Sequence, residues 1–146
     1  MMVFQTLTVI ILLVFYGCYY AKKLTQKKKG IRTTQIGKGK QGVPLYIEIA
    51  MGIATSCVLI IEVISIVFDW TISPDWLRVA GLIIAALGVA LFITAMLTMR
   101  DSWRAGVSKD KTNLVTTGIF KISRNPAFLG FDLMYVGVLM TFFNWV

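Results

Sequence analysis

The side chains best suited to chemistry lie between residues 113 and 130, around one predicted helix start. Asn125 followed by Pro126 predicts that start, because Asn is a favoured N-cap residue and Pro suits the first helical position. The free backbone amides of such a helix end attract anions, for example a carboxylate, and Arg124 adds a positive charge beside them. This part of the sequence therefore predicts a site for an anionic group.

Glycine and aromatic residues flank the predicted helix start on both sides. Thr117-Gly118 indicates a turn, and Gly130 would let another group approach closely. Phe120 and Phe128 could supply an aromatic wall. The same residue types also fit an interfacial loop followed by an ordinary membrane helix, so taken alone they leave both interpretations open.

The elements that must position these residues are apolar. The chain has 146 residues, of which 57% are hydrophobic and 15% charged, whereas soluble domains average about 45–50% and about 25%. A chain this short cannot hide that much apolar surface in one core, so lipid is its natural surrounding. Backbone within lipid must satisfy its own hydrogen bonds, which favours helices.

Four apolar segments, residues 2–20, 43–68, 77–99 and 126–146, each approach the roughly 20 residues that a helix needs to cross a bilayer. The expected fold is all-α, a transmembrane bundle of about four helices. We expect one polytopic membrane domain over residues 1–146, with a cytoplasmic interfacial loop at about residues 100–130. Small residues are frequent in segment 77–99, and Gly52 and Ser56 stand four apart in the second segment. Both patterns predict close helix packing, within the chain or between copies.

Basic residues cluster between the apolar segments. Eight lie within residues 22–40 and six within 100–124, out of fifteen in a chain of net charge +8. This placement favours a membrane surface over nucleic acid as the partner of the positive charge, and we expect no nucleic-acid binding. By the positive-inside rule, residues 22–40 and 100–125 are cytoplasmic, while the N-terminus and the turn at 69–76 lie outside.

Three acidic residues fall within the apolar segments, where an ionisable side chain is a functional candidate. Asp132, about one and a half turns beyond the predicted helix start, could face substrate or cofactor, or it could make a structural hydrogen bond or ion pair. Glu48 lies near the inner surface and Glu62 nearer the outer side, and neither is chosen as a site residue. Cys18 and Cys57 are predicted to be buried packing residues, and without histidine no metal site is indicated.

The motif elements in this region resemble those of a known family. Residues 114–120 (Leu-Val-Thr-Thr-Gly-Ile-Phe) and 123–130 (Ser-Arg-Asn-Pro-Ala-Phe-Leu-Gly) are similar to the signature of the isoprenylcysteine carboxyl methyltransferase and phospholipid methyltransferase family. A Ser-Trp-Arg-x-Gly element at 102–106 also matches, and the resemblance covers about residues 99–145. It implies S-adenosylmethionine as cofactor, held at the cytoplasmic face by Gly118, Phe120, Arg124, Asn125, Pro126, Phe128 and Gly130.

The resemblance implies an integral membrane methyltransferase that transfers a methyl group from S-adenosylmethionine to a lipophilic substrate. Trp103, Arg104 and Asp132 are the candidate substrate residues, and Trp103 and Arg104 fit an interfacial anchor equally well. The expected partners are membrane lipid and a lipophilic small molecule or lipidated substrate, with the oligomeric state left open. A carboxylate acceptor is already ionised at neutral pH and needs no general base, so a chain without histidine is compatible with this activity.

Two other interpretations stay open at this point. The family's members continue with a return helix and a tail that completes the cofactor site, whereas this sequence ends at Val146, which we interpret as a C-terminal truncation. The sequence therefore also fits a non-catalytic or truncated membrane protein of the same fold. A small four-helix transporter using Glu48 or Glu62 is the third interpretation, and the long segment at 100–125 argues against it because a transporter of this size should have short loops.

Overall fold

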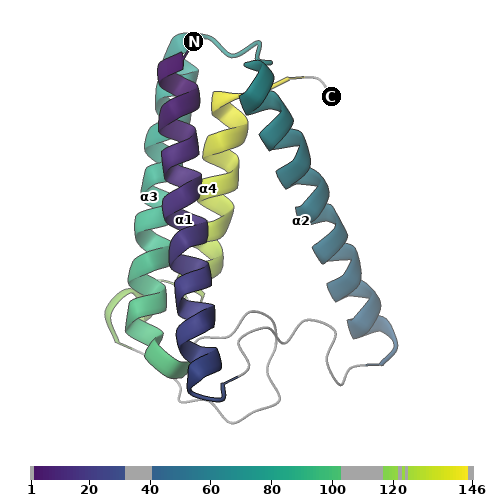
Figure 1. Cartoon of the computed structure of the whole chain (residues 1–146), viewed down its shortest axis with the longest axis vertical. Helices are drawn as coiled ribbons and strands as arrows, with labels where there is room; N and C mark the ends of the chain where they lie inside the picture. Colours follow the sequence, from purple (N-terminus) through teal and green to yellow (C-terminus); the bar gives the residue numbers. More distant parts are fainter. Residues whose placement is uncertain (1, 32–40, 103–116, 122, 124, 145–146) are drawn as a thin grey trace.

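The computed structural model describes residues 2–31, 41–102, 117–121, 123 and 125–144, and its regular elements are helices (Figure 1). The four α-helices are α1 (Met2–Lys28), α2 (Val43–Phe68), α3 (Asp75–Met99) and α4 (Pro126–Thr141). Two short 3-10 helices are η1 (Arg100–Ser102) and η2 (Gly118–Lys121). The prediction of an all-α fold with four long helices is confirmed.

Two helix ends differ from the predicted ones. α1 continues to Lys28 instead of ending at Tyr20, because the residues that follow are mostly Ala, Lys, Leu and Gln, which are good helix formers. α4 ends at Thr141 instead of residue 146, because the backbone that follows pairs with the α2–α3 connection. There the Ile72 N–H donates to the Phe143 carbonyl oxygen at 2.9 Å.

Within the described residues, three helices are long and apolar enough to cross a membrane: α1, α2, and α3 together with η1. α4 is also apolar but has 16 residues. At 1.5 Å per residue it is roughly 24 Å long, less than the about 30 Å of a bilayer's hydrocarbon core. The chain is a membrane protein with three helices of spanning length, and the fourth predicted span is shorter than expected.

α2 is the least packed helix, and Figure 1 shows it leaning away from the bundle of α1, α3 and α4. Near its C-terminal end, the Gln5 side chain of α1 donates to the Ile66 carbonyl oxygen at 2.7 Å. Farther along α2, nothing lies within 4 Å of the position that a Cβ on Gly52 would take, and Ser56 and Cys57 are exposed. The prediction that Cys57 is buried is therefore wrong, and Gly52 and Ser56 make no packing face within the described chain.

α3 and α4 pack so closely that their backbones touch. A Cβ added to Gly137 would lie 2.5 Å from the Gly81 carbonyl oxygen, and one added to Gly88 would lie 2.5 Å from the Met134 backbone nitrogen. Small residues permit this approach in lipid, where dispersion between the helices stabilises the contact. The prediction that small residues of segment 77–99 form a packing face is confirmed for the side of α3 that faces α4.

Aromatic rings fill the bundle between α1, α3 and α4. Phe15 of α1 is 1% exposed, and its ring centroid lies 4.6 Å from that of Phe92 and 5.6 Å from that of Phe131. The Phe131 ring lies 4.7 Å from that of Tyr135 on the same helix. Tilted aromatic pairs add stabilisation beyond the burial of their surface. This cluster fixes α1 against α3 and the first half of α4.

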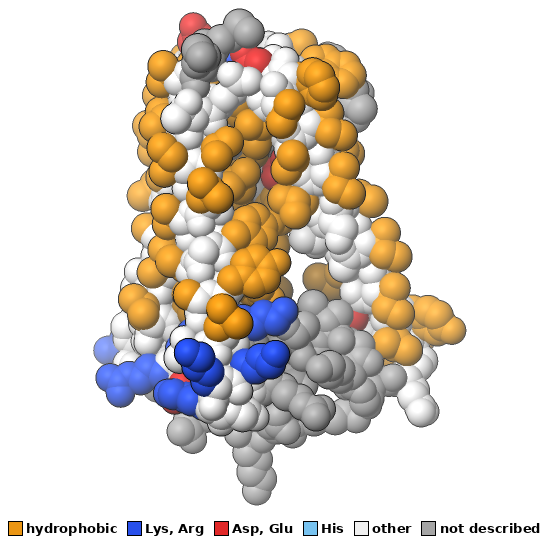
Figure 2. All heavy atoms as spheres, in the orientation of Figure 1, with side chains coloured by type: hydrophobic (Ala, Val, Ile, Leu, Met, Phe, Trp, Pro, Cys, Tyr) orange, Lys and Arg blue, Asp and Glu red, His pale blue; other side chains and the backbone are white. Residues whose placement is uncertain are grey.

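One end of the molecule is basic, and we call residues 22–31, 100–102 and 118–121 the basic end (Figure 2). At the opposite end Arg78 of α3 is buried, and its guanidinium donates to the Asp69 carboxylate at 2.7 Å. The same guanidinium lies over the ring of Phe4 at 4.2 Å and that of Phe142 at 5.1 Å. Arg78 therefore links the α2–α3 connection to α1 and to the end of α4.

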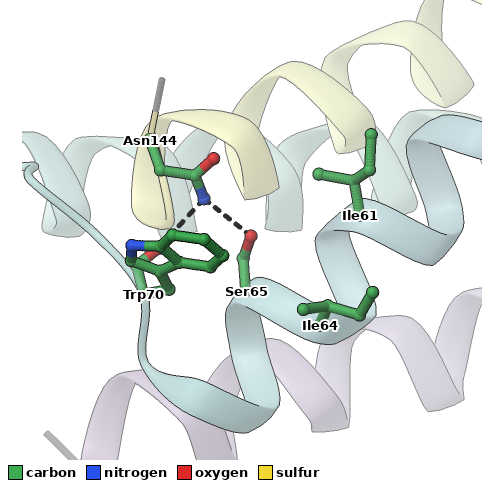
Figure 3. A pocket seen from close by; sticks show the side chains of 5 residues that line it. All are labelled: Ile61, Ile64, Ser65, Trp70 and Asn144. Atoms are coloured by element: carbon green, nitrogen blue, oxygen red, sulfur yellow. Dashed lines mark hydrogen bonds between the residues drawn. The ribbon is translucent and has the colours of Figure 1, made fainter. Parts of the chain in front are cut away.

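The segment after α4 holds the nearby end of α2. The side-chain amide of Asn144 donates to the Ser65 hydroxyl at 2.7 Å and to the Trp70 carbonyl oxygen at 3.1 Å (Figure 3). These three residues and two isoleucines of α2, Ile61 and Ile64, line a cavity of about 110 Å³. α2 is thus joined to the bundle at this end by polar contacts around a small apolar space.

Candidate functional site

α4 begins at Pro126 and is capped by Asn125, as the sequence predicts. The Asn125 Oδ1 accepts a hydrogen bond from the Phe128 backbone N–H at 3.4 Å, and the Asn125 backbone N–H donates to the Ser123 hydroxyl at 3.2 Å. Pro126 has no N–H, so Ala127 carries the remaining amide of the first turn, and no described residue accepts it. This helix start keeps a backbone donor that suits an anion.

Gly118 begins η2, where its φ of +63° is in the region that favours glycine. Among the described residues, a Cβ there would meet the Thr98 side chain at 3.9 Å, so the turn lies beside the end of α3. Phe120, two residues later, is half-buried and packs against the hydrophobic core. Phe128, in the first turn of α4, is 47% exposed. Both aromatic residues lie toward the basic end, and only Phe128 presents much of its surface outward.

Pro126 and Gly130 pack against neighbouring helices. Pro126 is fully buried, and a Cβ added to Gly130 would lie 2.6 Å from both the Gly88 carbonyl oxygen and the Phe92 backbone nitrogen of α3. These contacts give both residues a packing role. That they also line a cofactor pocket stays a prediction.

Three of the predicted site residues, Trp103, Arg104 and Arg124, lie outside the described residues. Asp132 is exposed on α4, in the part nearer the basic end. It makes no hydrogen bond with the described part of the chain. A role for Asp132 toward substrate or cofactor and the alternative of a structural hydrogen bond or ion pair both stay predictions.

The structure also brings together polar residues that sequence reasoning did not choose. Glu62 of α2 is 4% exposed, and both of its carboxyl oxygens lack a hydrogen-bond partner among the described residues. The hydroxyls of Tyr16 on α1 and Tyr135 on α4 are 2.8 Å apart. The acid within an apolar helix was visible in the sequence, whereas the tyrosine pair depends on how α1 and α4 pack.

Comparisons with known proteins identify the second part of the chain. The model of the phospholipid methyltransferase family matches residues 76–146, a range that contains almost all of α3 and the whole of η2 and α4. No curated protein and no solved structure matches the chain. The matched range includes both sequence elements on which the resemblance rests. Residues 76–146, slightly less than half of the 146 residues, therefore match the model of the phospholipid methyltransferase family, a family of membrane methyltransferases.

Proposed function

We propose that the protein is an integral membrane methyltransferase that uses S-adenosylmethionine to methylate a lipophilic substrate near its basic end. The observation that carries this proposal is the family match over residues 76–146, which contains both the Gly118 turn and the Asn125-capped start of α4. The positive-inside rule would put the basic end at the cytoplasmic face and the N-terminus outside.

The residues near the basic end fit this cofactor in chemical type. Its carboxylate needs backbone donors or a cation, and the first turn of α4 offers the Ala127 N–H, with Arg124 three residues earlier in the sequence. Its positively charged sulfur is attracted to aromatic faces, which Phe120 and Phe128 could supply. Gly118 has no side chain, so a bound group could approach the backbone of the turn closely.

S-adenosylmethionine supplies a methyl group bonded to a positively charged sulfur. The contribution of the chain is to hold and orient, with Arg124 and the α4 start acting on the carboxylate. The close packing of α4 on α3 keeps this helix start in place. Orientation of this kind can be worth effective molarities of about 10⁵–10⁸ M. A carboxylate acceptor would need no base, whereas an ammonium acceptor would first have to lose a proton.

A lipophilic acceptor would reach the basic end through the membrane. Figure 2 shows a furrow between α1 and α2 that has apolar side chains on both sides and widens toward the basic end. On α2, the apolar residues Ile47, Met51 and Ile53 are more than half exposed. Such a surface suits an acyl or prenyl chain, so membrane lipid and a lipidated or lipophilic molecule are the proposed partners.

Binding of S-adenosylmethionine to the purified chain in detergent, measured by isothermal titration calorimetry, tests the proposal. Arg124→Ala should raise the Kd roughly tenfold to hundredfold, because a hydrogen bond to a charged group contributes about 1.5–3 kcal/mol. Lys121→Ala is the matched control, since it removes one positive charge from an exposed residue of η2. It should change the Kd by less than about twofold, as expected of an exposed charge.

Two outcomes would contradict the proposal. Equal losses in Arg124→Ala and Lys121→Ala would mean that the basic end attracts the ligand only through its general charge. If the unaltered chain does not bind S-adenosylmethionine at all, the assignment of this cofactor to the chain fails.

A further inference from the structure

One face of α1 changes from apolar to basic along the helix. Its side chains are spaced three or four residues apart, and residues at that spacing lie one above another on a helix. In chain order they are Val9, Leu13, Tyr16, Tyr20, Lys23 and Lys27, and we call them the graded face. Two aliphatic residues are followed by two tyrosines and then by two lysines. This order matches one leaflet of a bilayer, from the hydrocarbon core through the interface to the headgroups.

Contacts along the graded face confirm that its members are neighbours. The ring centroids of Tyr16 and Tyr20 are 6.5 Å apart, and the Lys23 Nζ lies 5.9 Å from the centroid of the Tyr20 ring. A hydrogen bond of 2.8 Å joins the hydroxyls of Tyr16 and Tyr135, which fixes the deeper of the two rings against α4. The aromatic part of the face is thus held in place, with a lysine directly beside it.

The polar groups at the basic end of this face are available to a partner. Tyr20 is 54% exposed, and its hydroxyl makes no hydrogen bond with the described part of the chain. Lys27 is exposed, and neither it nor Lys23 forms an ion pair with a described residue. Lys29 differs, because its ammonium pairs with the Asp101 carboxylate at 2.8 Å. The graded face therefore offers two cations and one hydroxyl to a molecule outside the chain.

The dimensions of the graded face suit a lipid that stands beside α1. Leu13 precedes Lys23 by ten residues, roughly 15 Å along the helix axis, which is about half of a hydrocarbon core of about 30 Å. Leu13 is 67% exposed and Val9 is 42% exposed, so an acyl chain can lie along them. Figure 2 shows basic side chains gathered at this end of the molecule, below apolar ones. A phosphate at the lysines would therefore leave its acyl chains beside the aliphatic residues.

We propose that the graded face of α1 binds an anionic phospholipid of the leaflet at the basic end. The ammonium groups of Lys23 and Lys27 would donate to the phosphate oxygens, and the Tyr20 hydroxyl would donate to a phosphate or ester oxygen. A zwitterionic lipid also carries a phosphate, but the two lysines repel the ammonium of its headgroup. The face should therefore select anionic phospholipid over zwitterionic phospholipid.

This lipid site is separate from the proposed cofactor site. The whole graded face belongs to α1 and lies outside the family match at residues 76–146. Lipid binding to it can be measured without S-adenosylmethionine. Either proposal can therefore fail without the other.

Native mass spectrometry of the full chain in detergent tests the site, because it resolves the protein with and without a bound lipid. The probes are dioleoyl phosphatidylglycerol, which is anionic, and dioleoyl phosphatidylcholine, which has the same acyl chains and no net charge. Phosphatidylglycerol should bind about tenfold more tightly, as expected when one more hydrogen bond to a charged group is made. Lys23→Gln combined with Lys27→Gln should raise the Kd for phosphatidylglycerol about tenfold and remove the selectivity.

Matched variants separate the graded face from the general charge of the basic end. Lys22→Gln combined with Lys28→Gln removes two charges from other sides of α1, and should raise the Kd less than about threefold because salt screens charges that do not contact the headgroup. Tyr20→Phe keeps the ring and should raise the Kd about threefold, as expected for one hydrogen bond. Tyr46→Phe, at a 72% exposed tyrosine of α2, should leave the Kd unchanged.

Three outcomes would overturn the proposal. Equal affinity for the two lipids would show that the chain does not select an anionic headgroup. Equal losses in the two double lysine variants, with unchanged helical circular dichroism, would show that lipid responds only to the overall charge. Displacement of phosphatidylglycerol by an equal concentration of glycerol phosphate would show that the lysines bind a free phosphate ester and not a lipid.

Discussion

The α3–α4 pair and α2 are held in the molecule by different means. α3 meets α4 backbone to backbone, with Gly88 against Gly130 and Gly81 against Gly137. α2 also contains a glycine, Gly52, but nothing lies within 4 Å of its Cβ position. The side-chain hydrogen bonds that join α2 to the rest of the described chain gather near its C-terminal end.

This difference distinguishes the closely packed pair of α3 and α4, which we call the frame, from α2, which is a peripheral helix. Close contact along α3 and α4 gains dispersion energy at many atoms, so the start of α4 is fixed by the packing of the whole helix pair. α2 has few buried apolar contacts and a long exposed apolar surface, which is typical of elements with low local stability. The family match covers the frame and not α2. The frame therefore carries the proposed cofactor site, and α2 adds a surface toward lipid.

Breaking the charged link between the two regions should have the largest effect. Asp69, directly after α2, and Arg78 of α3 form an ion pair at 2.7 Å with side chains only 5% and 6% exposed. Arg78→Ala would leave the Asp69 carboxylate buried and unpaired, and should lower the free energy of unfolding by about 3–5 kcal/mol. Unfolding of the purified protein in detergent, followed by circular dichroism, measures this change.

A double variant separates the charge from the packing. Asp69→Asn with Arg78→Met removes both charges and keeps an unbranched side chain between the rings of Phe4 and Phe142. It should be less destabilised than Arg78→Ala, because no unpaired charge stays buried. A double variant that is as unstable as the single one would mean that the loss comes from the missing contacts of Arg78 and not from an unpaired carboxylate at Asp69.

One added methyl group should distinguish the two regions directly. Gly137→Ala places a Cβ against the backbone of α3, at 2.5 Å from the Gly81 carbonyl oxygen, so the helices must separate. Overpacking of this kind costs about 1–3 kcal/mol. The same unfolding measurement should show a lower midpoint temperature for Gly137→Ala.

Gly52→Ala on α2 is the matched control for that substitution. Its Cβ meets nothing within 4 Å, and Ala is the better helix former by about 0.5–1 kcal/mol. The variant should therefore be as stable as the unaltered chain or slightly more stable. Equal destabilisation by the two alanines would show that α2 is packed as tightly as α4, and the distinction between frame and peripheral helix would be lost.

Features that depend on neighbouring residues follow from the sequence, whereas features that depend on helix packing do not. Asn125 and Pro126 define the start of α4 by their own backbone preferences, and Gly118 has the positive φ that a glycine turn favours. The sequence could not predict that Phe120 is more buried than Phe128, because the burial of Phe120 depends on how η2 packs against the hydrophobic core. The hydrogen bond between Tyr16 and Tyr135 likewise requires knowledge of two helix faces at once.

The end of α4 gives a second example of the same limit. Residues 142–146 are mostly apolar, so hydrophobicity alone extends the predicted helix to the end of the chain. The helix stops at Thr141 because Phe143 pairs with Ile72 and Asn144 turns toward Ser65. Both partners lie in the α2–α3 region, far away in the sequence, and no local signal marks them.

The smallest expected effect concerns the polar attachment of α2. Asn144→Ala removes the donors to the Ser65 hydroxyl and the Trp70 carbonyl oxygen, and should change global stability by about 1 kcal/mol or less. Hydrogen exchange of backbone amides at residues 61–70 should rise while exchange across α3 stays the same, because the loss affects an element of low local stability. Thr55→Ala is the control, since its exposed hydroxyl bonds only within α2 to the Met51 carbonyl oxygen. If Asn144→Ala also speeds exchange in α3, α2 and the frame unfold as one unit. The polar contacts at one end of α2 would then be enough to make α2 part of the frame.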